Sequence, residues 1–128
     1  MPGKLSKTRR RENVRKGKRL EAQIERLAKK YGFIVEKRKK YGDAVIDLVL
    51  KKKGVVYIIE CKNYGGRKVG MDAVKQAEKA KKEYIRELLG DVVPVVVGND
   101  FNEDAKKRAS RTGVRLYKVE EIEKLMFY

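Results

Sequence analysis

The sequence contains no histidine and only one cysteine, Cys61. The absence of histidine excludes the usual zinc sites and every catalyst that uses a histidine base, and a lone cysteine excludes an internal disulfide. The groups that remain for chemistry are carboxylates and lysines. Any metal ion in this protein would therefore be a hard cation held by oxygen ligands.

Long apolar runs are also missing. The longest are Val55–Ile59 and Val92–Val97, far below the roughly 18 residues that a membrane span needs. The basic N-terminus does not lead into the apolar segment of a secretory signal. We therefore expect a soluble, cytoplasmic protein with no membrane partner.

Acidic residues are scarce beside basic ones. The chain has 18 Asp and Glu against 34 Lys and Arg, a formal net charge of +16 over 128 residues. This excess predicts a polyanionic partner, and nucleic acid first, because each phosphate that Lys or Arg neutralises releases counterions. The abundance of Lys and Glu is typical of hyperthermophile proteins. The length predicts one domain.

Residues 1–19 carry nine Lys or Arg, one Glu and almost no apolar periodicity. They are interpreted as a flexible basic arm that binds phosphates, followed by a single domain over residues 20–128. The candidate nucleic-acid contacts in this arm are Arg9, Arg10, Arg11, Arg15, Lys16, Lys18 and Arg19.

The first regular elements are predicted from spacing. Apolar residues recur at helical intervals over residues 20–31, and Gly32 is expected to end that helix. A short strand over residues 33–37 and a basic loop through Gly42 should follow.

Two longer strands, over residues 44–51 and 55–62, are separated by Lys53-Gly54. Glycine in that position supplies the positive φ of a two-residue turn, so the pair is expected to form a hairpin in which Lys52 opposes Val55.

Counting back from this turn places Asp47 opposite Glu60. Because side chains alternate along a strand, Lys62 should share the face of Glu60. Asp47 interrupts the apolar strand "AVIDLVL", where an unpaired carboxylate is costly to desolvate. The hairpin is therefore expected to bring an Asp, a Glu and a Lys together, although Glu60 and Lys62 could also form a plain ion pair.

The second half of the chain alternates helices and strands. The pattern predicts helices over residues 72–89, 102–110 and 120–126, and strands over 92–97 and 113–119. Pro94 suggests that the strand 92–97 lies at a sheet edge or carries a bulge. This order indicates an α/β sandwich that is mostly parallel in its second half.

These residues carry a resemblance. The chain resembles the PD-(D/E)XK nuclease superfamily, whose spaced Asp and Glu-x-Lys are matched by Asp47 and "ECK". "RKGKRLEAQIERLAKKYGF" is similar to the first helix of archaeal Holliday junction resolvases. "ECKNY", "VGMDAVKQ" and "VVVGNDFNEDAKKRASRTGVRLYKVEEIEKL" are similar to Mrr-type restriction endonuclease catalytic domains. Many of those domains carry Gln where this chain has Glu60.

The resemblance implies a restriction endonuclease-like three-layer sandwich with a central mixed β-sheet flanked by helices. It implies a Mg²⁺-dependent endonuclease that hydrolyses phosphodiester bonds in DNA, with Mn²⁺ expected to substitute and no small-molecule cofactor. Asp47, Glu60 and the backbone carbonyl of Cys61 would bind the metal, and Lys62 would orient the attacking water. Glu21 would orient a metal-bound water or join a second ion.

Glu21 is preferred over Glu25 because it lies nearer the apolar stripe of the first helix, although an ordinary solvated glutamate remains an alternative. Gln76 is a candidate because the family often places a glutamine on this helix, and simple helix packing is its alternative. Further nucleic-acid contacts, or residues that serve only solubility, are Lys39, Lys40, Arg67 and Lys68 on expected loops.

A homodimer is expected because cutting two strands needs two centres, and the terminal "LMFY" could supply an apolar patch. Branched or modified DNA stays open as the substrate. Two other functions stay open as well: a noncatalytic nucleic-acid-binding protein, which the charge alone supports, and a nuclease that processes RNA.

Overall fold

The computed structural model describes residues 7–62, 66–87 and 91–127. The elements run α1 (Lys7–Lys30), β1 (Ile34–Tyr41), β2 (Ala44–Lys52), β3 (Val55–Lys62), α2 (Met71–Glu87), β4 (Asp91–Gly98), α3 (Glu103–Thr112), β5 (Arg115–Lys118), a 3₁₀ turn (Val119–Glu121) and α4 (Ile122–Met126). The sheet has five strands in the order β1-β2-β3-β4-β5. β1, β2 and β3 pair antiparallel, whereas β3, β4 and β5 pair parallel.

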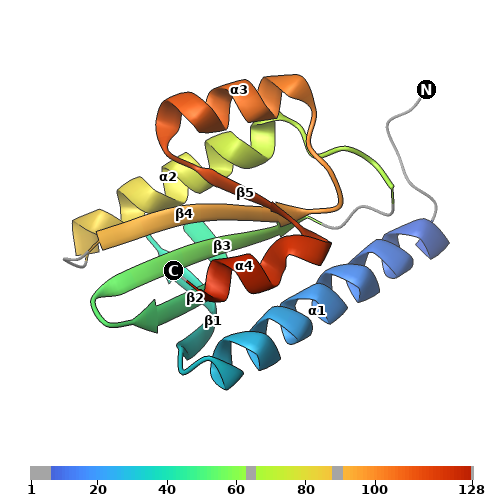
Figure 1. The fold of residues 1–128 in the computed structure, drawn as a ribbon. Helices are drawn as coiled ribbons and strands as arrows, with labels where there is room; N and C mark the ends of the chain where they lie inside the picture. The colour runs from blue at the N-terminus through green and yellow to red at the C-terminus, as the bar shows by residue number, and fades with distance from the viewer. Residues whose placement is uncertain (1–6, 63–65, 88–90, 128) are drawn as a thin grey trace.

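Helices cover both faces of this mixed sheet (Figure 1). α1 and α4 pack on one face, where Leu20, Ile24 and Leu125 meet the sheet residues Leu48 and Ile59. α2 and α3 lie on the other face, over two further apolar clusters. The expected three-layer α/β sandwich is confirmed.

The hairpin prediction is also confirmed. Lys53 and Gly54 have φ values of 50° and 80°, the positive pair of a type I′ turn. The register runs from Lys52 opposite Val55 to Leu48 opposite Ile59. A local turn signal was therefore enough to align the two strands.

The predicted start of the first helix is wrong. α1 begins at Lys7 rather than near Leu20, so residues 7–19 of the expected arm are helical. Lys and Arg are good helix formers, and no proline follows Pro2 in this stretch, so the helix needs no apolar stripe to extend. Its end is as predicted: Gly32 has φ 86°, and the Phe33 N–H reaches the Ala28 carbonyl at 2.9 Å. The division into arm and domain stays a prediction.

The basic loop expected after residue 37 is instead strand. β1 continues to Tyr41, so Lys39 and Lys40 lie on a strand at the sheet edge. An edge strand pairs on one side only and tolerates exposed charge, which explains why a run of basic residues adopts this conformation.

Pro94 lies in β4, an interior strand whose register with β3 is unbroken at Ile58 opposite Pro94, so neither the expected edge position nor the expected bulge is found. β5 begins to pair with β4 only at Val95, which opposes Arg115. The missing N–H of Pro94 therefore falls where β4 still has a free side.

The last described residues include two that pack in the core. Leu125 and Met126 are buried in the core, so they do not form the exposed apolar patch expected for a dimer, whereas Phe127 is 67% exposed. Tyr128 lies outside the described residues. Among the described residues, no helix combines the length and apolar character of a membrane span.

Candidate active site

The site begins where β2 and β3 separate. Their ladder ends at Leu48 and Ile59, one position before Asp47 and Glu60 would pair. Beyond this point Asp47 Oδ2 accepts a hydrogen bond from the Cys61 N–H at 2.9 Å. A carboxylate therefore occupies the place of a strand partner, and the strand opening holds Asp47 beside Glu60.

Glu60 is the only polar or charged side chain that is buried in the described chain, at 7% exposure. The pKa of its carboxyl is raised to about 8, mainly by burial. The negative charge of Asp47 and a hydrogen bond to Asp47 raise this pKa further, whereas the positive charge of Lys62 lowers it. A buried carboxylate with such a raised pKa is costly to ionise, so it favours a proton or a cation beside it.

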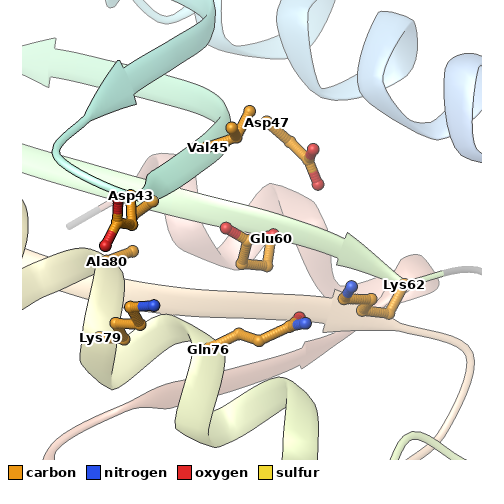
Figure 2. A pocket seen from close by; sticks show the side chains of 9 residues that line it. Asp43, Val45, Asp47, Glu60, Lys62, Gln76, Lys79 and Ala80 are labelled. Carbon is orange, nitrogen blue, oxygen red and sulfur yellow. The ribbon is translucent and has the colours of Figure 1, made fainter.

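Lys62 follows on the same face of β3. It makes no ion pair with any residue that the structure describes. Lys62 and Glu60 line one cavity of about 410 Å³ together with Asp47, Gln76 and Lys79. Figure 2 shows Gln76 on α2 pointing toward Lys62, with Glu60 between the sheet and the helix. The structure therefore brings four of the five predicted catalytic residues to one cavity.

Glu21 approaches the same place from α1. Burial raises the pKa of its carboxyl, and the charge of Asp47 raises it further, while Arg38 lowers it. Arg38 Nη2 lies 3.3 Å from Glu21 Oε2. Glu25, one turn on, is held by Lys29 and Lys37, whose hydrogen bonds lower the pKa of its carboxyl. Of the two helix glutamates, Glu21 is thus the one whose pKa is raised by the charge of Asp47. Glu21 does not line the cavity of Figure 2.

Two charged residues of the cavity were not predicted as site residues. Asp43, directly before β2, and Lys79 on α2 both line it. Lys79 could have been found from Gln76, because residues three apart on a helix share a face.

Gln76 and Lys62 also line a second cavity of about 440 Å³. Its wall includes Val69, which follows Arg67 and Lys68, two exposed residues predicted to bind nucleic acid. The basic segment before α2 therefore lies next to the site.

The other predicted nucleic-acid contacts are spread over α1 and β1. Lys18 and Arg19 are exposed on α1, and Lys39 and Lys40 are exposed on β1. Lys39 is engaged by Glu36 at 3.1 Å. The side chains of Arg9, Arg10, Arg11, Arg15 and Lys16 lie outside the described part of the structure.

The Cys61 side chain lies at the core. Its side chain packs against the cluster beneath α1 and α4, and burial, followed by Asp47, Glu21 and Glu60, raises the pKa of its thiol well above the usual value. A thiol that resists ionisation is a poor nucleophile. Its backbone carbonyl remains a predicted metal ligand.

The donor set suits a hard cation. Within residues 7–62, 66–87 and 91–127, no group of three or more His, Cys, Asp or Glu side chains gathers as a metal site. The paired carboxylates are Asp47 and Glu60. Mg²⁺ keeps several waters and commonly takes only one or two protein carboxylates, so this pair fits it.

The family model for the restriction endonuclease catalytic domain of the Mrr type matches residues 14–126. The chain belongs to this restriction endonuclease family. The predicted membership of the PD-(D/E)XK superfamily is thereby confirmed. No curated protein of similar sequence was found.

Several solved structures of larger proteins share this fold, and one of them is a protein of unknown function. A repair endonuclease from Pyrococcus abyssi is 20% identical with a TM-score of 0.62, and the similarity covers 92% of this chain and 48% of the endonuclease chain. EndoMS in a complex with double-stranded DNA is 20% identical with a TM-score of 0.59, covering 68% and 36%. The small subunit of the heterodimeric restriction endonuclease R.BspD6I is 16% identical with a TM-score of 0.55, covering 84% and 66%. This restriction endonuclease-family chain thus spans between about a third and two thirds of their lengths.

Proposed function

We propose that this protein is a Mg²⁺-dependent endonuclease that hydrolyses phosphodiester bonds in DNA. The observation that carries the proposal is the buried Glu60, whose carboxyl has a pKa of about 8 beside Asp47 and Lys62. Nothing in an ordinary stable core requires a buried carboxylate next to a second one, because burying charge without a close partner destabilises the fold. Perturbed carboxylates in a cavity are typical of catalytic sites.

Asp47, Glu60 and the backbone carbonyl of Cys61 would hold the metal ion. When bound, Mg²⁺ would lower the pKa of a coordinated water and neutralise charge on the scissile phosphate. The hydrogen bond from the Cys61 N–H to Asp47 would keep one carboxylate oxygen fixed, so that only small rearrangement accompanies ion binding.

The protein side chains supply the remaining steps. The Lys62 ammonium would donate a hydrogen bond that orients the attacking water, and would stabilise negative charge on the phosphate oxygens. The Gln76 amide, which points toward Lys62 in Figure 2, would orient the same water. Lys79 makes no ion pair with a described residue, and it would bind a neighbouring phosphate oxygen in the same cavity.

DNA is the substrate that the charge and the family support. The net charge of +16 favours a polyanion, and the exposed Lys18, Arg19, Lys40, Arg67 and Lys68 would contact its backbone. Supercoiled, branched and modified forms are alternatives that the cavity does not separate. A homodimer stays a prediction, supported by the need for two centres to cut two strands.

The test is cleavage of supercoiled, single-stranded, flapped and four-way-junction DNA in Mg²⁺ or Mn²⁺. Asp47→Asn and Glu60→Gln should lose cleavage, whereas the control Glu103→Gln, which changes an exposed α3 glutamate, should cut normally. Binding without cleavage of any substrate would favour the noncatalytic alternative. Faster cleavage of the RNA version of the same structure would favour RNA processing.

A further inference from the structure

Arg38 has an unusual backbone. Among the described residues that are not glycine, only Arg38 and Lys53 have positive φ, each at 50°. Lys53 is explained by its type I′ turn. Arg38 lies inside β1, where a left-handed residue is strained and persists only if the surroundings hold it.

The strain coincides with Asp47. β1 pairs Lys37 with Leu48 and Lys39 with Ile46, so Arg38 lies at the level of Asp47 between these two pairs. At this level the alternation of both strands shifts by one residue. Leu48 packs on the α1 side of the sheet, whereas Ile46, two positions away, packs on the α2 side.

The same shift is seen in β1, where Val35 packs on the α1 side and Tyr41 on the α2 side. Six positions apart, these residues would share a face in a regular strand. The left-handed Arg38 is therefore one half of a kink, and the other half carries Asp47.

The side chain of Arg38 points at Glu21. Its Nη2 donates to Glu21 Oε2 at 3.3 Å and to Oε1 at 3.5 Å. The Arg38 side chain is 57% exposed, while that of Glu21 is only 14% exposed. No other ion pair of Glu21 occurs in the described part of the chain.

Attachment of β1 to α1 does not explain this contact. One turn farther along α1, Lys37 Nζ already binds Glu25 Oε1 at 3.1 Å. That pair joins the same strand to the same helix without any strained residue. Arg38 differs from Lys37 in the carboxylate that it holds, because Glu21 is the one whose pKa the charge of Asp47 raises.

We propose that Arg38 is a positioning residue of the candidate active site, which holds the Glu21 carboxylate at the level of Asp47 so that α1 contributes to the metal site. The proposal rests on the nuclease function proposed above. A guanidinium can donate from several N–H groups in a fixed plane, so it orients a carboxylate better than a lysine does. Groups that orient metal-site carboxylates typically change ion affinity or activity by about 10–100-fold when removed.

The first measurement is Mn²⁺ affinity without DNA, by titration calorimetry. Arg38→Ala should weaken Mn²⁺ binding by about 10-fold, and Arg38→Lys by less. If Arg38 acted only as a nearby positive charge that repels the cation, its removal would instead tighten Mn²⁺ binding. Lys37→Ala, the matched control, removes a positive charge near Glu21 without removing a contact to it, so it should not weaken Mn²⁺ binding.

The second measurement separates positioning from substrate contact. Arg38→Ala should lower kcat about 10-fold with little change in KM, and Glu21→Gln combined with Arg38→Ala should be no worse than Glu21→Gln alone. Arg38→Gly should raise Tm, because glycine accepts the left-handed backbone without strain, and still bind Mn²⁺ weakly. A purely structural arginine would not separate stability from ion binding in this way.

Unchanged or tighter Mn²⁺ binding in Arg38→Ala, a change in KM alone, or additivity with Glu21→Gln would each overturn the inference. If the wild type cuts DNA and Arg38→Ala binds Mn²⁺ and cuts DNA equally well, the inference about Arg38 is wrong and the nuclease function stands. Weakened Mn²⁺ binding in Arg38→Ala, with no cleavage by the wild type, would remove the nuclease and leave the inference.

Discussion

Glu60 on β3 and Glu78 on α2 are both shielded glutamates, but the fold treats them in opposite ways. Arg108 on α3 donates from Nε and Nη2 to the two carboxylate oxygens of Glu78 at 2.8 and 3.0 Å, and this hydrogen bonding lowers the pKa of Glu78. Glu60 is buried beside Asp47, and its pKa rises to about 8. Glu78 thus has a bidentate arginine partner, whereas Glu60 has a second carboxylate beside it and would need a proton or a bound cation to neutralise it.

The largest expected difference between the two glutamates is in cleavage. Glu60→Gln keeps the shape of the side chain but loses the charge that would hold a metal ion, so DNA cleavage should fall by at least about 100-fold, the scale of losing one group that stabilises the transition state. Glu78→Gln should cut at the wild-type rate. Single-turnover cleavage of one labelled duplex measures both, and equal activities would remove the functional side of the comparison.

The next difference is in how stability depends on pH without divalent ions. Glu60 has a folded pKa of about 8, above the usual glutamate value of 4.5, so between these values the folded state binds more protons than the unfolded state. The free energy of unfolding should therefore fall as pH rises through this window, by no more than roughly 1.4 kcal/mol per pH unit for one proton.

Glu60→Gln removes that titration. Its urea-unfolding free energy should change less between pH 5 and pH 8 than that of the wild type, and it should be the more stable protein at pH 8. An identical pH dependence in the two proteins would show that Glu60 is not the group that titrates.

A smaller effect is expected from divalent ions at pH 8. Mg²⁺ or Mn²⁺ that binds only the folded state at ten times its Kd should stabilise the protein by about 1.4 kcal/mol. The rise in Tm should be present in the wild type and in Glu78→Gln, and absent in Asp47→Asn and Glu60→Gln. Calcium can separate ion binding from catalysis. If Ca²⁺ raises Tm but supports no cleavage, the rise in Tm measures ion binding at the site alone.

The contrast between Glu60 and Glu78 also shows what the sequence could and could not predict. The proximity of Asp47, Glu60 and Lys62 could be predicted because a two-residue turn fixes the register of a hairpin, and side chains alternate in a known way along each strand. These are local rules. They gave the neighbours of Glu60 but not its burial, which depends on where α2 crosses the sheet.

Residues on other elements were harder to foresee. Lys79 reaches the cavity only because α2 packs over β3, and Arg108 meets Glu78 across two helices. The kink at Arg38 was also missed, because no turn residue marks it and the strand was expected to end before it. The start of α1 was missed for a different reason, since an apolar stripe marks where a helix is packed rather than where it begins.

The smallest expected effect is on the structural glutamate itself. Glu78→Gln should lower Tm by only a few degrees at neutral pH, because a partly exposed ion pair contributes little to stability. Its pH dependence should have the opposite sign to that of Glu60. The folded pKa of Glu78 is lowered, so the stability that it contributes is present above its unfolded pKa and disappears as pH falls through the folded value.

Wild type and Glu78→Gln should therefore differ in unfolding free energy at pH 7 and converge in acid, whereas wild type and Glu60→Gln should differ at pH 8 and converge near pH 5. Unfolding curves of the three proteins at these pH values measure both differences. If the unfolding free energies of Glu78→Gln and the wild type differed more in acid than at pH 7, the pair with Arg108 would not be the source of the lowered pKa of Glu78. The opposite signs are what distinguish a carboxylate paired for stability from one held ready for an ion.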